Sequence, residues 1–557
     1  MIASIKNNHI VILLLCVVGI FFVNLDAIFV NIMEARNFIT AREMLHDGNW
    51  ILTTLNGEPR YQKPPLPTWL TAFTAALFGL KNLFALRLPA AIITLILIIT
   101  SYKLSFKITN NKKHAFISSL ILSTSFYIVF AGRNGQWDIF THGFMMVSIY
   151  QLFLFFKNDE RLYNRAILAS IFFGLSFMSK GPVSLYALWL PFLISFGIVY
   201  KFKNFRKRII PLVLFLIVGL LLSGWWHWYT YTFDPVSVTE ITKKETSNWT
   251  GYNVRPFYYY WSFFTQSGVW TIPAFIGLLY PYLKNKVSNK KAYTFTLIWT
   301  LASVVLLSII PEKKSRYLLP VLIPLALNTG FYIEYLINYF SEIKNKKETI
   351  PVYFNFGLIA SIGVLFPLGG YLFLTFSSLT SGQENPLDEN LIWYILLSIA
   401  LFSIGFIMFK NLYRKNIKSV FYLTIAFIVS IMCFGMPLAK SLSVNPEYKS
   451  LSLLNDWQAT SKLEVYEFND FTPEMIWDYG KPIKVLQKNG IREFPSEKKF
   501  GILVSEDQQA NFRKMYKNYS VEKITRYDMN PKGPESKSHR PRLWRDLYLV
   551  TFNESSF

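Results

Sequence analysis

Long apolar runs recur along most of the chain, and they constrain its fold more than any other feature of the sequence. Each run has about 17–25 residues with few charges, which is the length that an α-helix needs to cross the hydrocarbon core of a bilayer. The runs fall at 9–25, 84–102, 115–131, 139–156, 164–178, 183–200, 209–229, 267–283, 293–310, 317–338, 353–376, 391–409 and 419–436. The sequence therefore predicts a polytopic α-helical membrane protein with about thirteen transmembrane helices.

The composition agrees with this class of protein. Hydrophobic residues make up 52% of the chain and charged residues only 16%, which is below the roughly one quarter that is usual in soluble proteins. The net charge of +23 would suggest a nucleic-acid partner in a soluble protein, but the cytoplasmic loops of membrane proteins also accumulate Lys and Arg. We therefore expect membrane lipids, and no nucleic acid, among the partners of the chain.

Basic residues mark every second connection between the runs. These connections lie near 103–113, 157–165, 201–208, 284–291, 344–347 and 410–418. Because such loops stay in the cytoplasm, the N-terminus is expected there, and an odd number of spans places the C-terminus outside. The expected location is a plasma membrane, with an extracytoplasmic C-terminal part.

The tail from 437 to 557 is charged and carries short strand-like runs between helical stretches. We predict a transmembrane domain at 1–436, with an external loop at 26–83, and a small α/β extracytoplasmic domain at 437–557. The expected strands and helices of this second domain are Leu463–Phe468, Ile483–Gln487, Phe500–Val504 and Leu547–Phe552, and Pro446–Trp457 and Glu506–Lys517.

The first external loop is unusually polar for this chain. The spacing of apolar residues predicts an amphipathic helix over Ala35–Leu45 that lies along the membrane interface. Asn56-Gly57 predicts a turn, and the prolines after Lys63 stiffen the return into the membrane.

Five basic residues fall in connections that the alternation places outside, where the positive-inside rule predicts few: Arg36, Lys63, Arg133, Lys180 and Arg316. Each alone is explained equally well as an ordinary charge at a helix end. Together they indicate an anionic ligand, because a phosphate or pyrophosphate accepts bidentate contacts from Arg and point-charge contacts from Lys.

Three acids lie just outside predicted spans, beside these cations: Asp26, Glu34 and Asp138. A carboxylate in such a place serves as a general base that deprotonates an acceptor hydroxyl, as an oxygen ligand of a divalent cation, or as an ion-pair partner of a nearby Arg. The sequence leaves these three roles open, and it leaves the metal unknown.

The external stretch 230–266 is rich in aromatic residues. Arg255, Tyr258 and Tyr259 are the candidates here for lining a substrate site, and Arg133 of the connection 132–138 is a fourth candidate. Sugar rings stack on aromatic faces, but Tyr and Trp also form interfacial belts without any ligand, so both interpretations stay open.

Several short motifs in these loops occur together: Glu34-Ala35-Arg36, Asn49-Trp50, Leu55-Asn56-Gly57-Glu58-Pro59, Lys63-Pro64-Pro65-Leu66-Pro67, Gly132-Arg133 with Asp138, Lys180-Gly181-Pro182, Pro256-Phe257-Tyr258-Tyr259 and Arg316-Tyr317-Leu318-Leu319-Pro320. In this combination the chain resembles the GT-C membrane glycosyltransferases, in the branch of the aminoarabinose–lipid A transferases and the protein mannosyltransferases. The resemblance implies transfer of a sugar from a polyprenyl-phosphate carrier, at the outer leaflet, to a hydroxyl of a lipid (lipid A-like) or a protein.

The resemblance also assigns roles to residues. Glu34 and Arg36 match the acid and the arginine of an Asp-Glu-x-Arg pattern. Lys63 matches the lysine before the double proline, and Lys180 and Arg316 match later basic motifs.

Two positions depart from the family pattern. Met33 stands where the family has an Asp, which leaves the catalytic base open, with Asp26 as a substitute. Gln62 stands where the family commonly has an acid before the lysine, so one acidic ligand of a metal site is missing.

The leading hypothesis is an inverting hexosyl- or pentosyltransferase that uses a lipid-phosphate sugar. Glu34, Asp26 or Asp138 activates the acceptor, and the donor phosphate is bound by Arg36, Lys63, Lys180 and Arg316. No cofactor is expected, apart from a divalent cation as one alternative. The rival functions are a transporter or flippase of polyprenyl-linked sugars and a non-catalytic binder of them, although a transporter is expected to carry charges within its spans.

Overall fold

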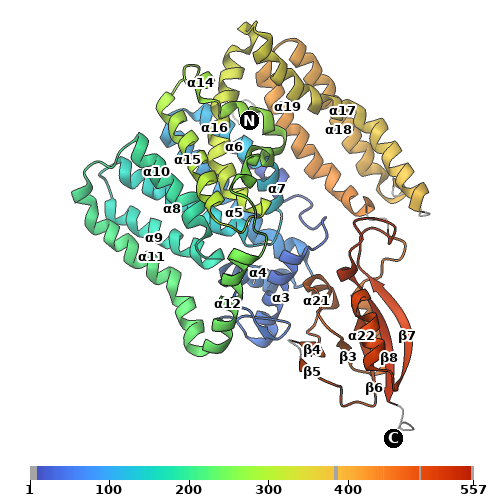
Figure 1. Ribbon diagram of the computed structural model, residues 1–557. Helices are drawn as coiled ribbons and strands as arrows, with labels where there is room; N and C mark the ends of the chain where they lie inside the picture. The colour runs from blue at the N-terminus through green and yellow to red at the C-terminus, as the bar shows by residue number, and fades with distance from the viewer. Residues whose placement is uncertain (1–8, 382–386, 443–444, 489–490, 553–557) are drawn as a thin grey trace.

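The computed structural model describes residues 9–381, 387–442, 445–488 and 491–552. Figure 1 shows a large helical body, formed by the chain up to about residue 440, and a smaller part that carries most of the strands. The helices of the body are α2 (His9–Phe21), α3 (Ile32–Asp47), α4 (Leu66–Phe78), α5 (Leu83–Thr109), α6 (Lys112–Thr124), α7 (Phe126–Gly132), α8 (Asp138–Lys157), α9 (Leu162–Lys180), α10 (Leu190–Val199), α11 (Phe205–Phe233), α12 (Pro235–Gly251), α13 (Thr271–Gly277), α14 (Tyr280–Leu283), α15 (Lys290–Ile309), α16 (Leu319–Tyr339), α17 (Lys346–Ser381), α18 (Leu387–Tyr413) and α19 (Ile417–Ser430).

Among the described residues, nine helices are long and apolar enough to cross a membrane, and each coincides with a predicted span. A tenth predicted span, 115–131, is the pair α6 and α7, which is bent by 67°. The predicted spans 9–25 and 183–200 coincide with shorter apolar helices, His9–Phe21 and Leu185–Val199. The polytopic helical class is therefore confirmed.

The predicted span 267–283 is not one continuous helix. It is divided among short helical segments, of which α13 and α14 are two. The first break lies at Gly268, whose φ of 67° and ψ of −117° are not helical. The prediction of a straight helix here is wrong because hydropathy measures how apolar a run is and does not detect a backbone break.

The spans divide into a buried centre and an exposed periphery. We compare the share of residues that is buried in the most apolar 18-residue stretch of each span. This share is 78% in α8 and 89% in the span Ser315–Glu342, but only 28% in α11 and 22% in the span Lys346–Phe376. Because a lipid-facing helix stays apolar on its outer side, we infer that α8 and α16 form the centre, and that α11 and α17 contact lipid.

The first external loop folds against the helical body. The predicted helix 35–45 is confirmed as α3, which ends at Gly48 in the left-handed conformation with φ 73°. Ten of its sixteen residues are buried, so α3 is an internal helix and not the surface helix that the sequence predicts. The predicted turn is also confirmed, because Asn56 and Gly57 both have positive φ and join β1 (Thr54–Leu55) to β2 (Glu58–Pro59).

The C-terminal part is built on a four-stranded sheet with the order β3-β6-β8-β7. The strands β3 and β6 are parallel, and the other pairs are antiparallel. The predicted α/β class is confirmed, although β7, β5 and α21 were not predicted. The elements are α20 (Leu454–Ser461), β3 (Val465–Glu467), α21 (Pro473–Tyr479), β4 (Gln487–Lys488), β5 (Ile491–Arg492), β6 (Lys499–Val504), α22 (Gln509–Met515), β7 (Tyr519–Asp528) and β8 (Trp544–Phe552).

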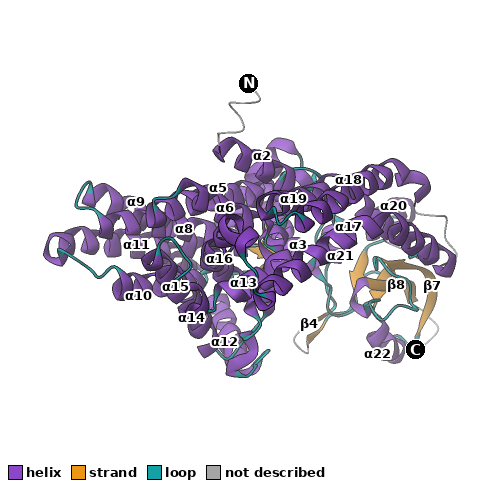
Figure 2. Ribbon diagram, turned by 90° about the horizontal axis from the view of Figure 1, so that it is seen from above, coloured by secondary structure: helices purple, strands orange, loops and turns teal. Residues whose placement is uncertain are grey.

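Side chains alternate between the two faces of this sheet, as the pleat requires. Leu503 packs in one cluster with Leu454 of α20 and Met475 of α21. Its neighbours Ile502 and Val504 pack in another cluster with α22. The sheet therefore has α20 and α21 on one face and α22 on the other, and Figure 2 shows its strands gathered at one side of the helical body.

The face with α21 docks on the first external loop. The Phe38 and Trp477 rings meet edge to face at 5.3 Å between centroids. The Asn56 side chain donates to the Ile483 carbonyl at 2.8 Å and accepts from the Ile483 N–H at 2.8 Å. Helix α3 is thus enclosed between the helical body and the C-terminal part; the domain division between residues 436 and 437 stays a prediction.

One buried ion pair fixes the start of α3. The Glu34 carboxylate accepts from Arg87 Nε at 2.8 Å and Arg87 Nη2 at 3.1 Å, and from the Gly135 N–H at 2.9 Å. The same carboxylate closes a capping box with Asn31, whose side chain accepts from the Met33 and Glu34 N–H groups. The acid therefore ties together α3, α5 and the turn before α8.

We expect Glu34→Gln to destabilise the fold, because it leaves the buried Arg87 guanidinium without a counter-charge. Breaking a buried ion pair by removing one partner costs about 3–5 kcal/mol, and the thermal unfolding temperature of the purified protein in detergent measures the loss. The control is Glu240→Gln, at an exposed position of α12.

Replacing both members, as Glu34→Leu with Arg87→Met, should recover much of the lost stability, because no buried charge then stays unpaired. If Glu34→Gln instead unfolds at the wild-type temperature, the ion pair does not have this structural role.

Candidate functional site

The predicted phosphate-binding cations Lys63, Lys180, Arg36 and Arg316 lie close enough to interact through their charges. Lys180 is at the end of α9, and it forms a buried ion pair with Asp138, the first residue of α8. Its ammonium lies 5.2 Å from the centre of the Tyr317 ring, which follows Arg316 in the chain. This group of four cations and Asp138, called the cation cluster below, forms the candidate site.

Lys63 lies just before the double proline that precedes α4, and its side chain is half-buried. Burial lowers the pKa of Lys63 to about 8, and the positive charges of Lys180 and Arg60 contribute to the decrease. Burial also lowers the pKa of Arg36, and the charge of Arg316 lowers it further. Cations that depress one another's pKa in a partly buried space form a site that favours an anion.

Two polar atoms of the cluster are buried without a hydrogen-bond partner among the described residues: Asp138 Oδ2 and Arg316 Nε. Asp138 uses its other oxygen to accept from Lys180. A buried polar atom without a partner costs about 1–3 kcal/mol, so both atoms are positioned to bind a substrate group or solvent. Of the three predicted acids, Asp138 is the one that the structure places in this cluster.

The other two acids lie elsewhere. Glu34 is fully buried, and five donor contacts from Asn31, Arg87 and Gly135 occupy its oxygens. This position corrects the expectation that Glu34 is free to deprotonate an acceptor. Asp26 is exposed in the connection that follows α2 and lines a different cavity.

Arg133 has a structural contact in place of the predicted substrate contact. Its guanidinium donates to the carbonyls of Ile20, Val23 and Asn24, at 2.5, 2.9 and 2.6 Å. Ile20 is in the last turn of α2, where helices leave their carbonyl groups unpaired, and Val23 and Asn24 lie just after the helix. Arg133 therefore caps α2, which corrects its expected place in the substrate site.

The aromatic stretch adjoins the turn that carries Arg316. The Arg255 N–H donates to the Pro311 carbonyl at 3.2 Å, and the Tyr259 hydroxyl lies 3.4 Å from Ser315 Oγ. Arg255 and Tyr258 are exposed and Tyr259 is half-buried. Arg255 and Tyr259 therefore contact the segment next to Arg316, and the contact of all three residues with substrate stays a prediction.

Sequence reasoning did not select two residues that belong here. Arg60 is buried, and its guanidinium stacks 4.7 Å from the centre of the Trp137 ring, next to Asp138 in the chain; burial lowers its pKa to about 9. Tyr317 faces Lys180. The signal for both was their position beside predicted cations, which by itself does not separate a site residue from a surface residue.

Within the part of the chain that the structure describes, no group of three or more His, Cys, Asp or Glu residues has the arrangement to hold a metal ion. A divalent cation stays an untested alternative.

Residues 62–228 match the family described as dolichyl-phosphate-mannose-protein mannosyltransferase. An undecaprenyl phosphate-α-4-amino-4-deoxy-L-arabinose arabinosyl transferase of Photorhabdus laumondii is 25% identical over 358 residues, which cover 60% of this chain and 60% of that protein. An uncharacterized protein of Aquifex aeolicus is 27% identical over 300 residues, which cover 53% of this chain and 57% of that protein. The chain thus matches about three fifths of the length of these relatives.

The solved structure of ArnT from Cupriavidus metallidurans bound to undecaprenyl phosphate superposes with a TM-score of 0.69 at 15% identity, and it covers 98% of both chains. The apo form of the same protein superposes with a TM-score of 0.67. The comparisons confirm the resemblance that the motifs indicate: this chain is similar to the GT-C membrane glycosyltransferases of the aminoarabinose transferase type, and it has their fold.

Proposed function

We propose that the chain is a membrane glycosyltransferase that transfers a hexosyl or pentosyl unit from a polyprenyl-phosphate-linked donor to a hydroxyl of a lipid or protein. The reaction takes place at the outer leaflet of the bacterial inner membrane, with the N-terminus in the cytoplasm. The names of the relatives and the ligand of the ArnT structure support the class of donor. The cation cluster is the observation that carries the proposal.

The cluster has more positive than negative charge. Four positive charges come from Lys63, Lys180, Arg36 and Arg316. The carboxylates of Asp138 and Glu245, whose charges act on these cations, supply two negative charges. A phosphodiester donor supplies a negative charge that compensates part of this excess. When the bond from the anomeric carbon to the phosphate oxygen breaks, a further negative charge develops on the leaving phosphate, and fixed cations stabilise that charge in the transition state.

The acceptor oxygen attacks the anomeric carbon from the face opposite the phosphate, so a new carbon–oxygen bond forms with inversion as the old one breaks. The hydroxyl proton goes to a carboxylate within hydrogen-bond reach. Asp138 is our candidate, because its Oδ2 is buried without a partner whereas the Glu34 oxygens are occupied. The transferred proton leaves Asp138 neutral beside Lys180.

One observation favours the rival function of a non-catalytic binder of the carrier lipid. The ion pair of Asp138 with Lys180 lowers the basicity of the one carboxylate in the cluster. Transfer assays separate the two functions, because a binder retains the polyprenyl-phosphate sugar without turning it over.

We expect Lys63→Ala to abolish most sugar transfer while the protein still inserts into membranes, because Lys63 is half-buried in a loop and stabilises charge on the leaving phosphate. The measurement is movement of label from a radiolabelled polyprenyl-phosphate sugar to a membrane extract. Lys514→Ala, at an exposed position of α22, is the matched control. If Lys63→Ala transfers sugar at the wild-type rate, Lys63 does not stabilise the leaving phosphate.

Donor binding should weaken at alkaline pH. The pKa of Lys63 is lowered to about 8, so its ammonium is mostly present at pH 7 and is lost as the pH rises through 8. A phosphodiester keeps its single charge over this range. The apparent Kd of the donor should therefore rise by about tenfold between pH 7 and pH 9.

In Lys63→Arg the guanidinium stays charged between pH 7 and pH 9, so the apparent Kd of the donor should change little with pH. If the apparent Kd rises with pH as steeply in Lys63→Arg as in the wild type, the group that titrates is not Lys63.

A further inference from the structure

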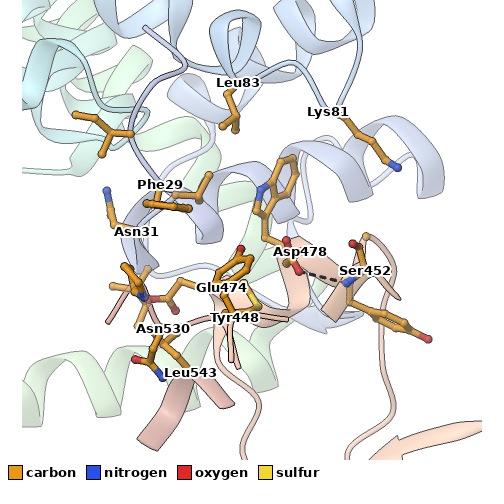
Figure 3. Close-up of a pocket in the computed structure, with 18 of the residues that line it drawn as sticks. Phe29, Asn31, Lys81, Leu83, Tyr448, Ser452, Glu474, Asp478, Asn530 and Leu543 are labelled. Atoms are coloured by element: carbon orange, nitrogen blue, oxygen red, sulfur yellow. Dashed lines mark hydrogen bonds between the residues drawn. The ribbon is translucent and has the colours of Figure 1, made fainter. Parts of the chain in front are cut away.

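A cavity of about 1140 Å³ lies apart from the cation cluster, between the first external loop and the C-terminal part. Figure 3 shows Leu83, at the start of α5, on one side of it, and Tyr448, Asn530 and Leu543 of the C-terminal part on the other. The function proposed above makes no use of this space.

Arg42 lines the cavity from α3 and is only 5% exposed. Its Nη1 donates to the Ile476 carbonyl at 3.3 Å. Its Nη2 is buried without a hydrogen-bond partner among the described residues, and the Glu43 carboxylate lies 3.9 Å away. A buried guanidinium nitrogen without a partner beside a cavity indicates an anionic or strongly accepting group in that cavity.

The charges that line the cavity favour an anion. Six Lys or Arg and four Asp or Glu side chains line it. Arg542 is neutralised by Glu474 at 2.7 Å. Within the described ranges, four of these cations form no ion pair with a carboxylate: Lys81, Lys481, Lys532 and Arg540.

Apolar residues line the cavity beside the start of a candidate membrane span. Phe29 follows the apolar helix α2 and is 43% exposed, and Leu83 begins the span α5. The adjacent helix α4 exposes Phe73, Leu77 and Phe78 by about 60% each. Such an apolar face beside the end of a span is typical of contact with lipid at the interface.

From this pairing of cations with an apolar edge, we propose that the cavity binds the phosphate headgroup of an anionic phospholipid of the outer leaflet. The phosphate lies against Arg42, Lys481 and Arg540, and the acyl chains leave past Phe29 and Leu83. The bound lipid then joins α3 to the C-terminal part. This inference does not require that the chain transfers sugar.

The test is binding of phosphatidylglycerol to the full-length protein in detergent, measured by native mass spectrometry. Phosphatidylcholine and inorganic phosphate are the comparison probes. We expect phosphatidylglycerol to bind more tightly than phosphatidylcholine. The double variant Lys481→Glu with Arg540→Glu should lower its affinity by about tenfold or more, since cations near an anionic lipid surface attract it strongly.

The matched control is Lys514→Glu with Lys517→Glu, which reverses two exposed charges on the other face of the sheet. A thermal unfolding scan of both variants verifies that they fold. Equal loss in both double variants, or equal binding of phosphatidylcholine, would overturn the proposal. Inorganic phosphate that competes fully with the lipid would also overturn it and would assign the cavity to a soluble anion.

A second measurement locates the lipid. In a background where Cys16 and Cys433 are replaced by Ser, a cysteine introduced by Ser452→Cys at the cavity edge should react with maleimide. Phosphatidylglycerol should slow this reaction, whereas phosphatidylcholine should not. An unprotected Ser452→Cys variant that still binds phosphatidylglycerol would place the lipid elsewhere and overturn the assignment.

Discussion

The arrangement of the loops around α3 depends on one fully paired arginine, Arg87. Its guanidinium donates to the Glu34 carboxylate and to the carbonyls of Leu25 and Ile28, at 2.9 and 2.8 Å. A buried guanidinium is tolerated only where its donors are satisfied, so the connection after α2, the start of α3 and the first turn of α5 have to meet at this point. Since Gly135 also donates to Glu34, the turn that leads to Asp138 is positioned by the same contact.

This paired centre differs from the cation cluster beside it. At Arg87 every charge has a counter-charge or a carbonyl, whereas the cluster holds more positive charge than Asp138 compensates. The two arrangements are consistent with different roles, since a satisfied network fixes a structure and an unsatisfied one is positioned to interact with a ligand. A rigid frame around the cluster also keeps its cations from moving apart, although their mutual repulsion favours separation.

The sequence predicted the transmembrane class because a bilayer requires long apolar helices, and length and hydropathy are local properties. It also predicted α3 and the Asn56-Gly57 turn, which depend on nearby residues. It left an ion-pair role open for Glu34 but did not identify the partners, because Arg87 is 53 residues away and Gly135 is 101 residues away. A carboxylate in a loop has the same appearance in the sequence whether it is buried in an ion pair or free. The capping role of Arg133, 113 residues from Ile20, was missed for the same reason.

Helix α3 separates two anion-binding regions by its geometry. Arg36 and Arg42 are six residues apart, so on a helix with 3.6 residues per turn they point in directions about 120° apart. Arg36 interacts with the charge of Arg316 in the cation cluster, whereas Arg42 lines the cavity under the C-terminal part. Arg36 also senses the charges of Glu474 and Arg542, which lie on the cavity side. Because an arginine stays protonated at neutral pH, Arg36 keeps its positive charge whether or not the cavity is occupied, and α3 carries one cation toward each region.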